Sequence, residues 1–302
     1  MKKIAILSFI VLCSTSLWSQ QDPQASMYFF NPLQFNPGYA GSRGSFNVTG
    51  VTRAQWLGWD GAPNTQYIAF HGPVLRQNVG LGGNIAYDRI GSRTAFNAMA
   101  NFAYHLRLNE DNLRLSLGLS GGFQQFGYDF GGLTVTDPTD ANYLNSYRQT
   151  KVNFGFGAYL FDKNFYAGVS LPRLIKRSMD TLGGRAYLQR HLFVTGGYVY
   201  NLNSVIDLKP SLLLKYTANG PLIADINFSV HLYNKFWAGA LYRTTDCAGI
   251  NFAYQIKDWC MAGYSFDFPL NGKFLNQWGT HEIMISFDLR GKNNAIQSPR
   301  YF

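Results

Sequence analysis

Segments of about ten residues in which apolar and polar side chains alternate recur along most of the chain, and each is followed by a turn. Successive residues of a strand point to opposite faces of a sheet, so this period of two predicts strands with one apolar and one polar face. Residues 113–123, 152–160 and 282–289 show the pattern well. The clearest case alternates Ala224, Ile226, Phe228, Val230 and Leu232 with Asp225, Asn227, Ser229 and His231.

Fourteen such segments can be counted, which predicts fourteen strands in one all-β domain, because no linker or shift in composition divides residues 46–290. An even strand number is typical of bacterial outer-membrane β-barrels. A soluble sandwich would also alternate, so the pattern alone does not separate the two folds. The strands are expected at 46–56, 66–74, 79–89, 93–108, 112–126, 149–161, 164–171, 190–202, 206–217, 223–233, 235–245, 247–257, 259–268 and 279–289.

The connections between these strands alternate in length. Outer-membrane barrels have short periplasmic turns and long external loops, whereas a sandwich has no reason to sort its loops in this way. The sequence therefore predicts a transmembrane antiparallel β-barrel with both chain ends on the periplasmic side. The even-numbered connections are brief, at 75–78, 109–111, 162–163, 203–205, 234 and 258, and the odd-numbered ones include the long stretches 57–65, 127–148, 172–189 and 269–278.

Composition supports a surface that is not an ordinary solvated one. Apolar residues make up 46% of the 302 residues and charged residues 14%, about half the usual charged share. No apolar run is long enough for a membrane-spanning helix, so a helical membrane protein is excluded. Aromatic residues gather near the predicted strand ends, as in interfacial girdles, although aromatic residues are also good strand formers. The girdle candidates are Trp56, Trp59, Tyr87, Tyr104, Tyr198, Tyr200, Trp237, Tyr242, Trp259 and Trp278.

Residues 1–20 resemble a cleaved secretory signal peptide, with Lys2 and Lys3 before the apolar stretch 4–12. A lipid anchor at Cys13 is disfavoured, because Leu12 stands where a small residue is needed. The mature chain is therefore expected to be a multi-pass protein of the outer membrane.

Two cysteines remain after such a cleavage, Cys247 and Cys260. They are predicted at opposite ends of neighbouring strands, which is too far for a disulfide. Both thiols are expected to be free.

Charged and histidine side chains on the strands fall largely on the face assigned to the lumen. Their mixed signs favour a hydrated interior with internal ion pairs over a purely anion-selective pore. The lumen candidates are Arg53, His71, His105, Arg107, Arg114, Lys209, Lys215, Asp225, His231, Asp267 and Asp288, together with Glu282.

Several kinds of chemistry are excluded or unsupported. The net charge is +9, but the basic residues are scattered along the strands without a patch or a recognition motif, so no nucleic-acid binding is expected. The five histidines and the cysteines lack the close spacing of a metal site. No GxSxG elbow or Ser/His signature is present, so we expect no catalytic residue, no cofactor and no metal.

The two ends of the mature chain stand apart from the strands. Residues 21–45 carry three prolines, two Asn-Pro pairs and several aromatic residues. We expect this periplasmic leader to pack into the periplasmic mouth or to dock a periplasmic partner; the alternative is a loosely ordered leader. Residues 291–302 are expected to form a periplasmic tail that folds against the barrel or a partner.

The opening QDPQASMYFFNPLQFNPGYAG, the late AGYSFDFPL followed by GTHEI, and the terminal SPRYF resemble the PorP/SprF family of outer-membrane proteins. The resemblance spans residues 21–302. It implies a non-enzymatic component of the type IX secretion system that supports secretion or surface attachment of cargo, often large adhesins, and in some members gliding. The partners it implies are outer-membrane lipid, periplasmic ring or stalk components of the machine, and the C-terminal domains of secreted cargo.

The positions that match the family are candidates for partner contact or for plugging the lumen. The alternatives are a structural turn at Asn36–Gly38 and a hydrogen-bonded lumen pair of His281 and Glu282. The candidates are Asn31, Pro32, Asn36, Pro37, Gly38, Tyr39, Ala40 and Gly41 near the start, and Gly279, His281, Glu282, Ser298, Pro299, Arg300, Tyr301 and Phe302 near the end.

A second class of function is a diffusion channel or solute transporter, because a barrel of this size can leave an aqueous lumen. The Pro- and aromatic-rich leader favours the secretion component, since a plain porin needs no such segment and is usually constricted by an inward loop, here 127–148. A third class, an outer-membrane hydrolase, lacks a nucleophile constellation.

Overall fold

The computed structural model describes residues 24–74, 78–109, 113–130, 146–175, 177–178, 187–218, 220–244, 246–270 and 278–289. The predicted signal peptide, Cys13 and the tail 291–302 lie outside these residues. None of the described residues forms a helix that is long and apolar enough to span a membrane.

The described chain is a run of antiparallel strands preceded by three short 3₁₀ helices. The helices are η1 (Tyr28–Phe30), η2 (Pro32–Gln34) and η3 (Pro37–Tyr39). The strands are β1 (Phe46–Ala54), β2 (Asn64–Val74), β3 (Val79–Ile90), β4 (Arg93–Arg107), β5 (Arg114–Tyr128), β6 (Tyr147–Phe161), β7 (Phe165–Leu171), β8 (Arg177–Ser178), β9 (Tyr187–Leu188), β10 (His191–Tyr198), β11 (Tyr200–Asn201), β12 (Ile206–Thr217), β13 (Ile223–Leu232), β14 (Phe236–Arg243), β15 (Cys247–Lys257), β16 (Cys260–Pro269) and β17 (Thr280–Leu289).

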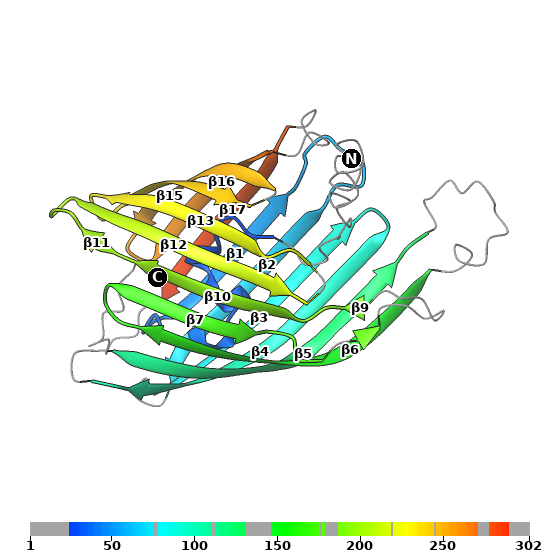
Figure 1. Cartoon of the computed structure of the whole chain (residues 1–302), viewed down its shortest axis with the longest axis horizontal. Helices are drawn as coiled ribbons and strands as arrows, with labels where there is room; N and C mark the ends of the chain where they lie inside the picture. Colours follow the sequence, from blue (N-terminus) through cyan, green and yellow to red (C-terminus); the bar gives the residue numbers. More distant parts are fainter. Residues whose placement is uncertain are drawn as a thin grey trace, which may run out of the picture.

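These strands close into a barrel (Figure 1). Each wall strand pairs antiparallel with its chain neighbours, and β1 pairs with β17 to join the two ends of the sheet. Because β10 and β11 follow one another and both pair with β12, they act as one wall strand, and the barrel has 14 strands. The small β8–β9 hairpin forms a separate sheet. The predicted fold and strand number are confirmed.

The connections sort by length between the two ends of the barrel, as predicted. We call the end that carries the turns 75–78, 162–164, 202–205 and 233–235 the short-turn end. The opposite, long-loop end carries every long connection, at 55–63, 129–146, 172–190 and 270–279. The antiparallel up-and-down topology places successive connections at alternate ends, so the long, odd-numbered connections all lie at the same end.

Apolar side chains face outward and polar side chains face the lumen. On β13, Ile226 and Phe228 are exposed, whereas Asp225 and Asn227 are buried. Most girdle candidates are exposed near the strand ends, but Trp237 is an exception because it points into the lumen and is buried. Apart from Arg243 at the strand end, the inward face of β14 is as apolar as its outward face, so alternation could not assign the direction of Trp237.

The described residues that precede β1 lie inside the barrel, where Figure 1 shows them in dark blue. We call residues 24–45 the lumen segment. Its two Asn-Pro pairs begin η2 and η3, since proline suits the first position of a helical turn. One apolar cluster packs η1 against β10, β12 and β14–β17, and a second packs Leu33, Tyr39 and Ala40 against β2, β4, β6 and β7. The lumen segment therefore contacts both sides of the wall and fills much of the lumen between them.

Cys247 and Cys260 are free, as predicted. Cys247 begins β15 at the long-loop end and Cys260 begins β16 at the short-turn end. The length of a wall strand separates the two thiols.

Candidate functional site: the lumen segment and its anchors

A first ion cluster on the wall binds the backbone at the start of the lumen segment. Both guanidinium Nη atoms of Arg53 contact carboxylates, Asp267 at 2.9 Å and Glu282 at 2.9 Å. Glu282 also accepts the backbone N–H groups of Ser26 at 2.9 Å and Met27 at 2.8 Å. Charge-assisted hydrogen bonds of this kind are the strong ones, so Glu282 is a main anchor of the lumen segment.

The Ser26 hydroxyl completes this first cluster. It donates to Asp267 at 2.5 Å and accepts from Arg53 Nη1 at 2.8 Å. Ser26, Arg53, Asp267 and Glu282 are all buried. A buried carboxylate is tolerated when it is paired and hydrogen-bonded, and here the lumen segment supplies part of that bonding.

A second ion cluster lies next to the first. Arg243 donates to both carboxylate oxygens of Asp225, at 2.8 Å and 3.1 Å, and to the backbone carbonyl of Ala25 at 2.9 Å. Lys215 contacts the same carboxylate at 2.7 Å and is hydrogen-bonded to the side chain of Gln24. With the first cluster, three basic and three acidic side chains are brought together in the lumen. Taken together, the two clusters have equal numbers of basic and acidic side chains, which agrees with the internal ion pairs that the mixed signs in the sequence predicted.

An aromatic layer follows the two clusters. Phe30 meets the edge of Trp237 with ring centroids 5.7 Å apart, and Trp237 stacks on His231 at 3.8 Å. Lys209 Nζ lies 5.4 Å from the Trp237 ring centroid and 5.8 Å from that of Phe29, within the range of a cation–π contact. The hydroxyl of the neighbouring Tyr28 donates to the Asp225 carbonyl at 3.2 Å.

The second Asn-Pro turn is held by side-chain and backbone bonds. Asn36 caps η3 by accepting the Gly38 N–H at 2.8 Å, and its amide donates to the carbonyl of Ala158 on β6 at 3.0 Å. Ser116 on β5 donates to the Gly38 carbonyl at 2.6 Å. The predicted structural turn at Asn36–Gly38 is therefore present, and the same residues also contact the wall.

Glycines on the inner wall make this close approach possible. A Cβ on Gly118 of β5 would lie 2.5 Å from the Cα of Gly38, and a Cβ on Gly157 of β6 would overlap the Asn36 side chain. On β3, Gly80 leaves room for the carbonyl of Ala40. Glycine is the residue that lets two backbones meet in this way.

The end of the lumen segment is fixed near the short-turn end. Gly41, at a φ of +77°, donates its N–H to His71 Nδ1 at 3.0 Å. Arg43 donates to the Tyr39 hydroxyl at 2.8 Å and to the Phe30 carbonyl at 2.9 Å. The segment thus runs through the lumen from the long-loop half to the short-turn end.

The structure brings most of the sequence candidates to this segment or to the wall that faces it. Asn31, Pro32, Asn36, Pro37, Gly38, Tyr39, Ala40 and Gly41 are buried within the lumen segment. Arg53, His71, His105, Arg114, Lys209, Lys215, Asp225, His231, Asp267 and Glu282 are buried on the wall, and Asp288 is half-buried. Pro299, Arg300, Tyr301 and Phe302, with Ser298, lie outside the described residues.

Three expectations need correction. Arg107 is exposed, because it ends β4 at the rim of the barrel. His281 and Glu282 are no lumen pair, because neighbouring strand residues point to opposite faces. His281 bonds the Tyr264 hydroxyl at 2.7 Å and the Trp278 carbonyl at 3.0 Å near Gly279, away from the buried Glu282. The leader also reaches beyond a mouth position, since Ser26 contacts side chains in the long-loop half.

Sequence reasoning missed Arg243, which is fully buried and central to the second cluster. The available signal was its position directly opposite Asp225 in the β13–β14 register. That register could not be fixed while the apolar inward face of β14 obscured its alternation.

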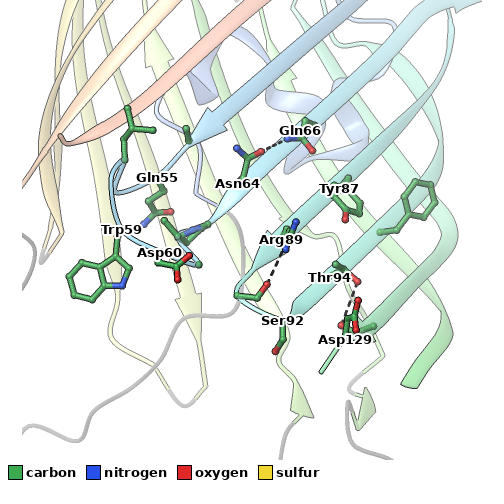
Figure 2. Close-up of a pocket in the computed structure, with 18 of the residues that line it drawn as sticks. Gln55, Trp59, Asp60, Asn64, Gln66, Tyr87, Arg89, Ser92, Thr94 and Asp129 are labelled. Atoms are coloured by element: carbon green, nitrogen blue, oxygen red, sulfur yellow. Dashed lines mark hydrogen bonds between the residues drawn. The ribbon is translucent and has the colours of Figure 1, made fainter. Parts of the chain in front are cut away.

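The two larger hollows between described residues near the long-loop end differ in position and size. An inner cavity of about 120 Å³ lies against the lumen segment and is lined by Phe35, Tyr67, Asp88, Arg93 and Asn153, among others. A half-open hollow of about 1370 Å³ lies at the outer rim, where Figure 2 shows Asn64, Gln66, Tyr87, Arg89 and Thr94 around it. Within the described residues no group of His, Cys, Asp and Glu side chains could hold a metal ion.

Comparison with solved structures gives matches of low sequence identity with TM-scores below 0.5. The outer membrane protein Omp33 of Acinetobacter baumannii has 11% identity and a TM-score of 0.49, over 82% of this chain and 100% of that chain. The KdgM porin has 9% identity and a TM-score of 0.36, over 81% and 99%. BamA from Haemophilus ducreyi lacking POTRA domains 1–3 has 11% identity and a TM-score of 0.42, over 82% and 70%.

No curated protein sequence matches the chain. The family model described as type IX secretion system membrane protein PorP/SprF matches residues 18–287, which is nearly the whole barrel and the lumen segment. This chain, an outer-membrane β-barrel, belongs to the PorP/SprF family of type IX secretion system membrane proteins.

Proposed function

We propose that this protein supports the secretion or surface attachment of type IX cargo, such as large adhesins, by binding partners at its two rims. It carries out no catalytic step. Its partners would be periplasmic ring or stalk components at the short-turn end and the C-terminal domains of cargo at the long-loop end. In hosts that glide, loss of such cargo would impair gliding.

The observation that carries this proposal is the occupied lumen. Glu282 and Arg243 bind the backbone of the lumen segment, and glycines of the wall receive the turn at Asn36–Gly38. A channel needs a continuous aqueous path, whereas this lumen is crossed by buried aromatic side chains such as Phe29 and Tyr39. The surfaces that can engage a partner without removing the segment are therefore the rims.

Deletion of the gene in its own host tests the proposal. Surface and culture-fluid proteins of the deletion strain would be compared with those of the parent by mass spectrometry. We expect the loss of one or a few large proteins with type IX C-terminal domains, restored by a plasmid copy. Loss of all such proteins would indicate a core role instead of a cargo-specific one, and an unchanged profile would contradict the proposal.

The alternative, a diffusion channel or solute transporter, has no observation in its favour among the described residues. It predicts steady conductance of the intact protein in planar bilayers and no change in surface proteins on deletion. The two functions are therefore separated by the same deletion strain and one electrical recording.

A further inference from the structure

Strand β6 is paired along its whole length on one side and along less than half of it on the other. With β5 it pairs from Tyr147 to Phe161. With β7 it pairs from Phe156 to Phe161. Beyond that point Leu174 N donates to the Phe154 carbonyl at 2.9 Å. Among the described residues, none pairs in a ladder with residues 148–152 on this second side.

The side chain of Asn153 marks where the pairing ends. Its Oδ1 accepts the Phe154 N–H at 2.8 Å and the Ile175 N–H at 3.3 Å. Both backbone groups of Phe154 therefore point toward the β7 side. Because the backbone groups of alternate residues point to the same side of a strand, those of Arg148, Thr150 and Val152 point to the open side as well. The open edge presents one N–H and one C=O from each of these three residues.

This edge starts at Val152, on the border of the apolar band of the wall, and continues beyond the band through Thr150 and Arg148. The outward side chains of β6 are apolar from Val152 to Leu160, and at the long-loop side of them stand Thr150 and Arg148. Arg148 also lines the outer hollow together with Gln125 and Asp129. An unpaired edge is not tolerated in lipid, but in water it is a ready template for another strand.

The chemistry of the edge points to the kind of segment that fits it. Arg148 and Lys151 are basic, and the polar Gln149 and Thr150 lie between them. An extended segment with acidic side chains would match this charge, while backbone bonds supply most of the affinity in strand addition. Under the orientation proposed above, the edge faces the outside of the cell, where exported cargo is the partner at hand.

We propose that the open edge of β6, at Arg148, Thr150 and Val152, pairs with an extended acidic segment of a cargo protein and so adds a strand to the barrel sheet. The proposal rests on the proposed function, because it names how the same rim receives cargo. The added strand would place the attached cargo domain beside the outer hollow.

Proline at position 150 tests the edge without breaking the wall. Thr150→Pro removes an N–H that faces the open side and leaves the β5 ladder intact, as proline does on edge strands. Thr150→Ala is the matched control, because it shortens the side chain but keeps the N–H. In a deletion strain complemented with each variant, we expect Thr150→Pro to lower surface-retained cargo about tenfold or more relative to Thr150→Ala, at equal barrel abundance.

A second measurement uses the purified, cargo-free protein. Hydrogen exchange at the amides of Arg148, Thr150 and Val152 is expected to be fast, whereas amides that pair with β5 exchange slowly. Slow exchange at the three edge amides would overturn the proposal, because the chain itself would then cover the edge.

The outcomes separate this proposal from the function on which it rests. If the deletion strain keeps all its surface proteins, the proposed function is wrong. If that strain loses cargo but Thr150→Pro retains it as well as Thr150→Ala does, the function stands and the edge proposal fails. Equal loss in both variants would also refute the edge proposal, because the backbone N–H would then not be the determinant.

Discussion

The hydrogen bonding between the wall and the lumen segment depends on a few single side chains, and Glu282 is the main example. Its two carboxylate oxygens accept from Arg53, Ser26 and Met27, and the residue is 1% exposed. A carboxylate in this position gains little from water, so its partners must satisfy it. The wall strands and the lumen segment are therefore stabilised together, and neither has its full set of hydrogen bonds without the other.

The variant Glu282→Gln tests this dependence. The amide has the same shape but no charge, so Arg53 loses one of its two carboxylate partners in a buried site. We expect the free energy of unfolding in lipid vesicles to fall by about 3 kcal/mol, the usual cost of breaking a buried ion pair. Urea unfolding followed by tryptophan fluorescence measures it.

Asp246→Asn is the control for Glu282→Gln. Asp246 also contacts an arginine, Arg243 at 3.4 Å, but its side chain is 30% exposed. Because the Asp246 carboxylate still reaches water and Arg243 keeps both of its bonds to Asp225, the loss should be about 1 kcal/mol or less, so this variant should unfold almost like the parent. Equal losses in the two variants would contradict the anchoring role of Glu282.

Gly118 gives a second prediction at the scale of one residue. In Gly118→Ala the new methyl group would meet the Gly38 backbone, which cannot rotate away as a side chain can. We expect a loss of about 1–3 kcal/mol in the same unfolding measurement, as for overpacking in a core. Gly50→Ala is the control, because a Cβ there meets nothing within 4 Å. A Gly118→Ala protein as stable as Gly50→Ala would mean that the turn at Asn36–Gly38 is loosely seated.

At the scale of elements, the strands could be predicted and the lumen segment could not be placed. A strand can be predicted from its own period of two, which the residues around Ile226 and Phe228 show directly. The partners of the lumen segment lie far away in sequence, with Ser26 separated from Glu282 by 256 residues. Local pattern carries no information on such contacts. The same limit explains why Arg243 was not predicted as a lumen residue, because its strand has apolar side chains on both faces.

The lumen segment as an element makes an electrical prediction. The intact protein should show no steady conductance in planar bilayers, because residues 24–45 occupy the lumen. Glu282→Gln should show intermittent openings as the weakened start of the segment leaves its site. Asp246→Asn should stay closed like the parent. Steady conductance of the parent protein would show that a continuous path passes the segment and would favour the channel.

At the scale of the whole molecule, the barrel is uneven along its rim. Strands β4, β5 and β6 each have 15 residues, whereas β7 has 7. A strand of about 9–11 residues spans the apolar core of a membrane, so the longer strands carry the sheet beyond it. Because that extension stands at the long-loop end, it offers one partner surface on one side of the rim.

Which end faces the outside of the cell decides how both proposals are interpreted, and two cysteine variants measure it. Asp60→Cys lies in the exposed connection 55–63 at the long-loop end, and Lys163→Cys lies in the exposed turn between β6 and β7 at the short-turn end. Both would be made in a Cys260→Ser background, since Cys260 is partly exposed and Cys247 is buried. Long loops of outer-membrane barrels face outward, so a membrane-impermeant maleimide should label Asp60→Cys in intact cells and Lys163→Cys only after lysis. The reverse pattern would put the β6 edge in the periplasm, where a component of the secretion machine, not exported cargo, would be the partner for its open backbone groups.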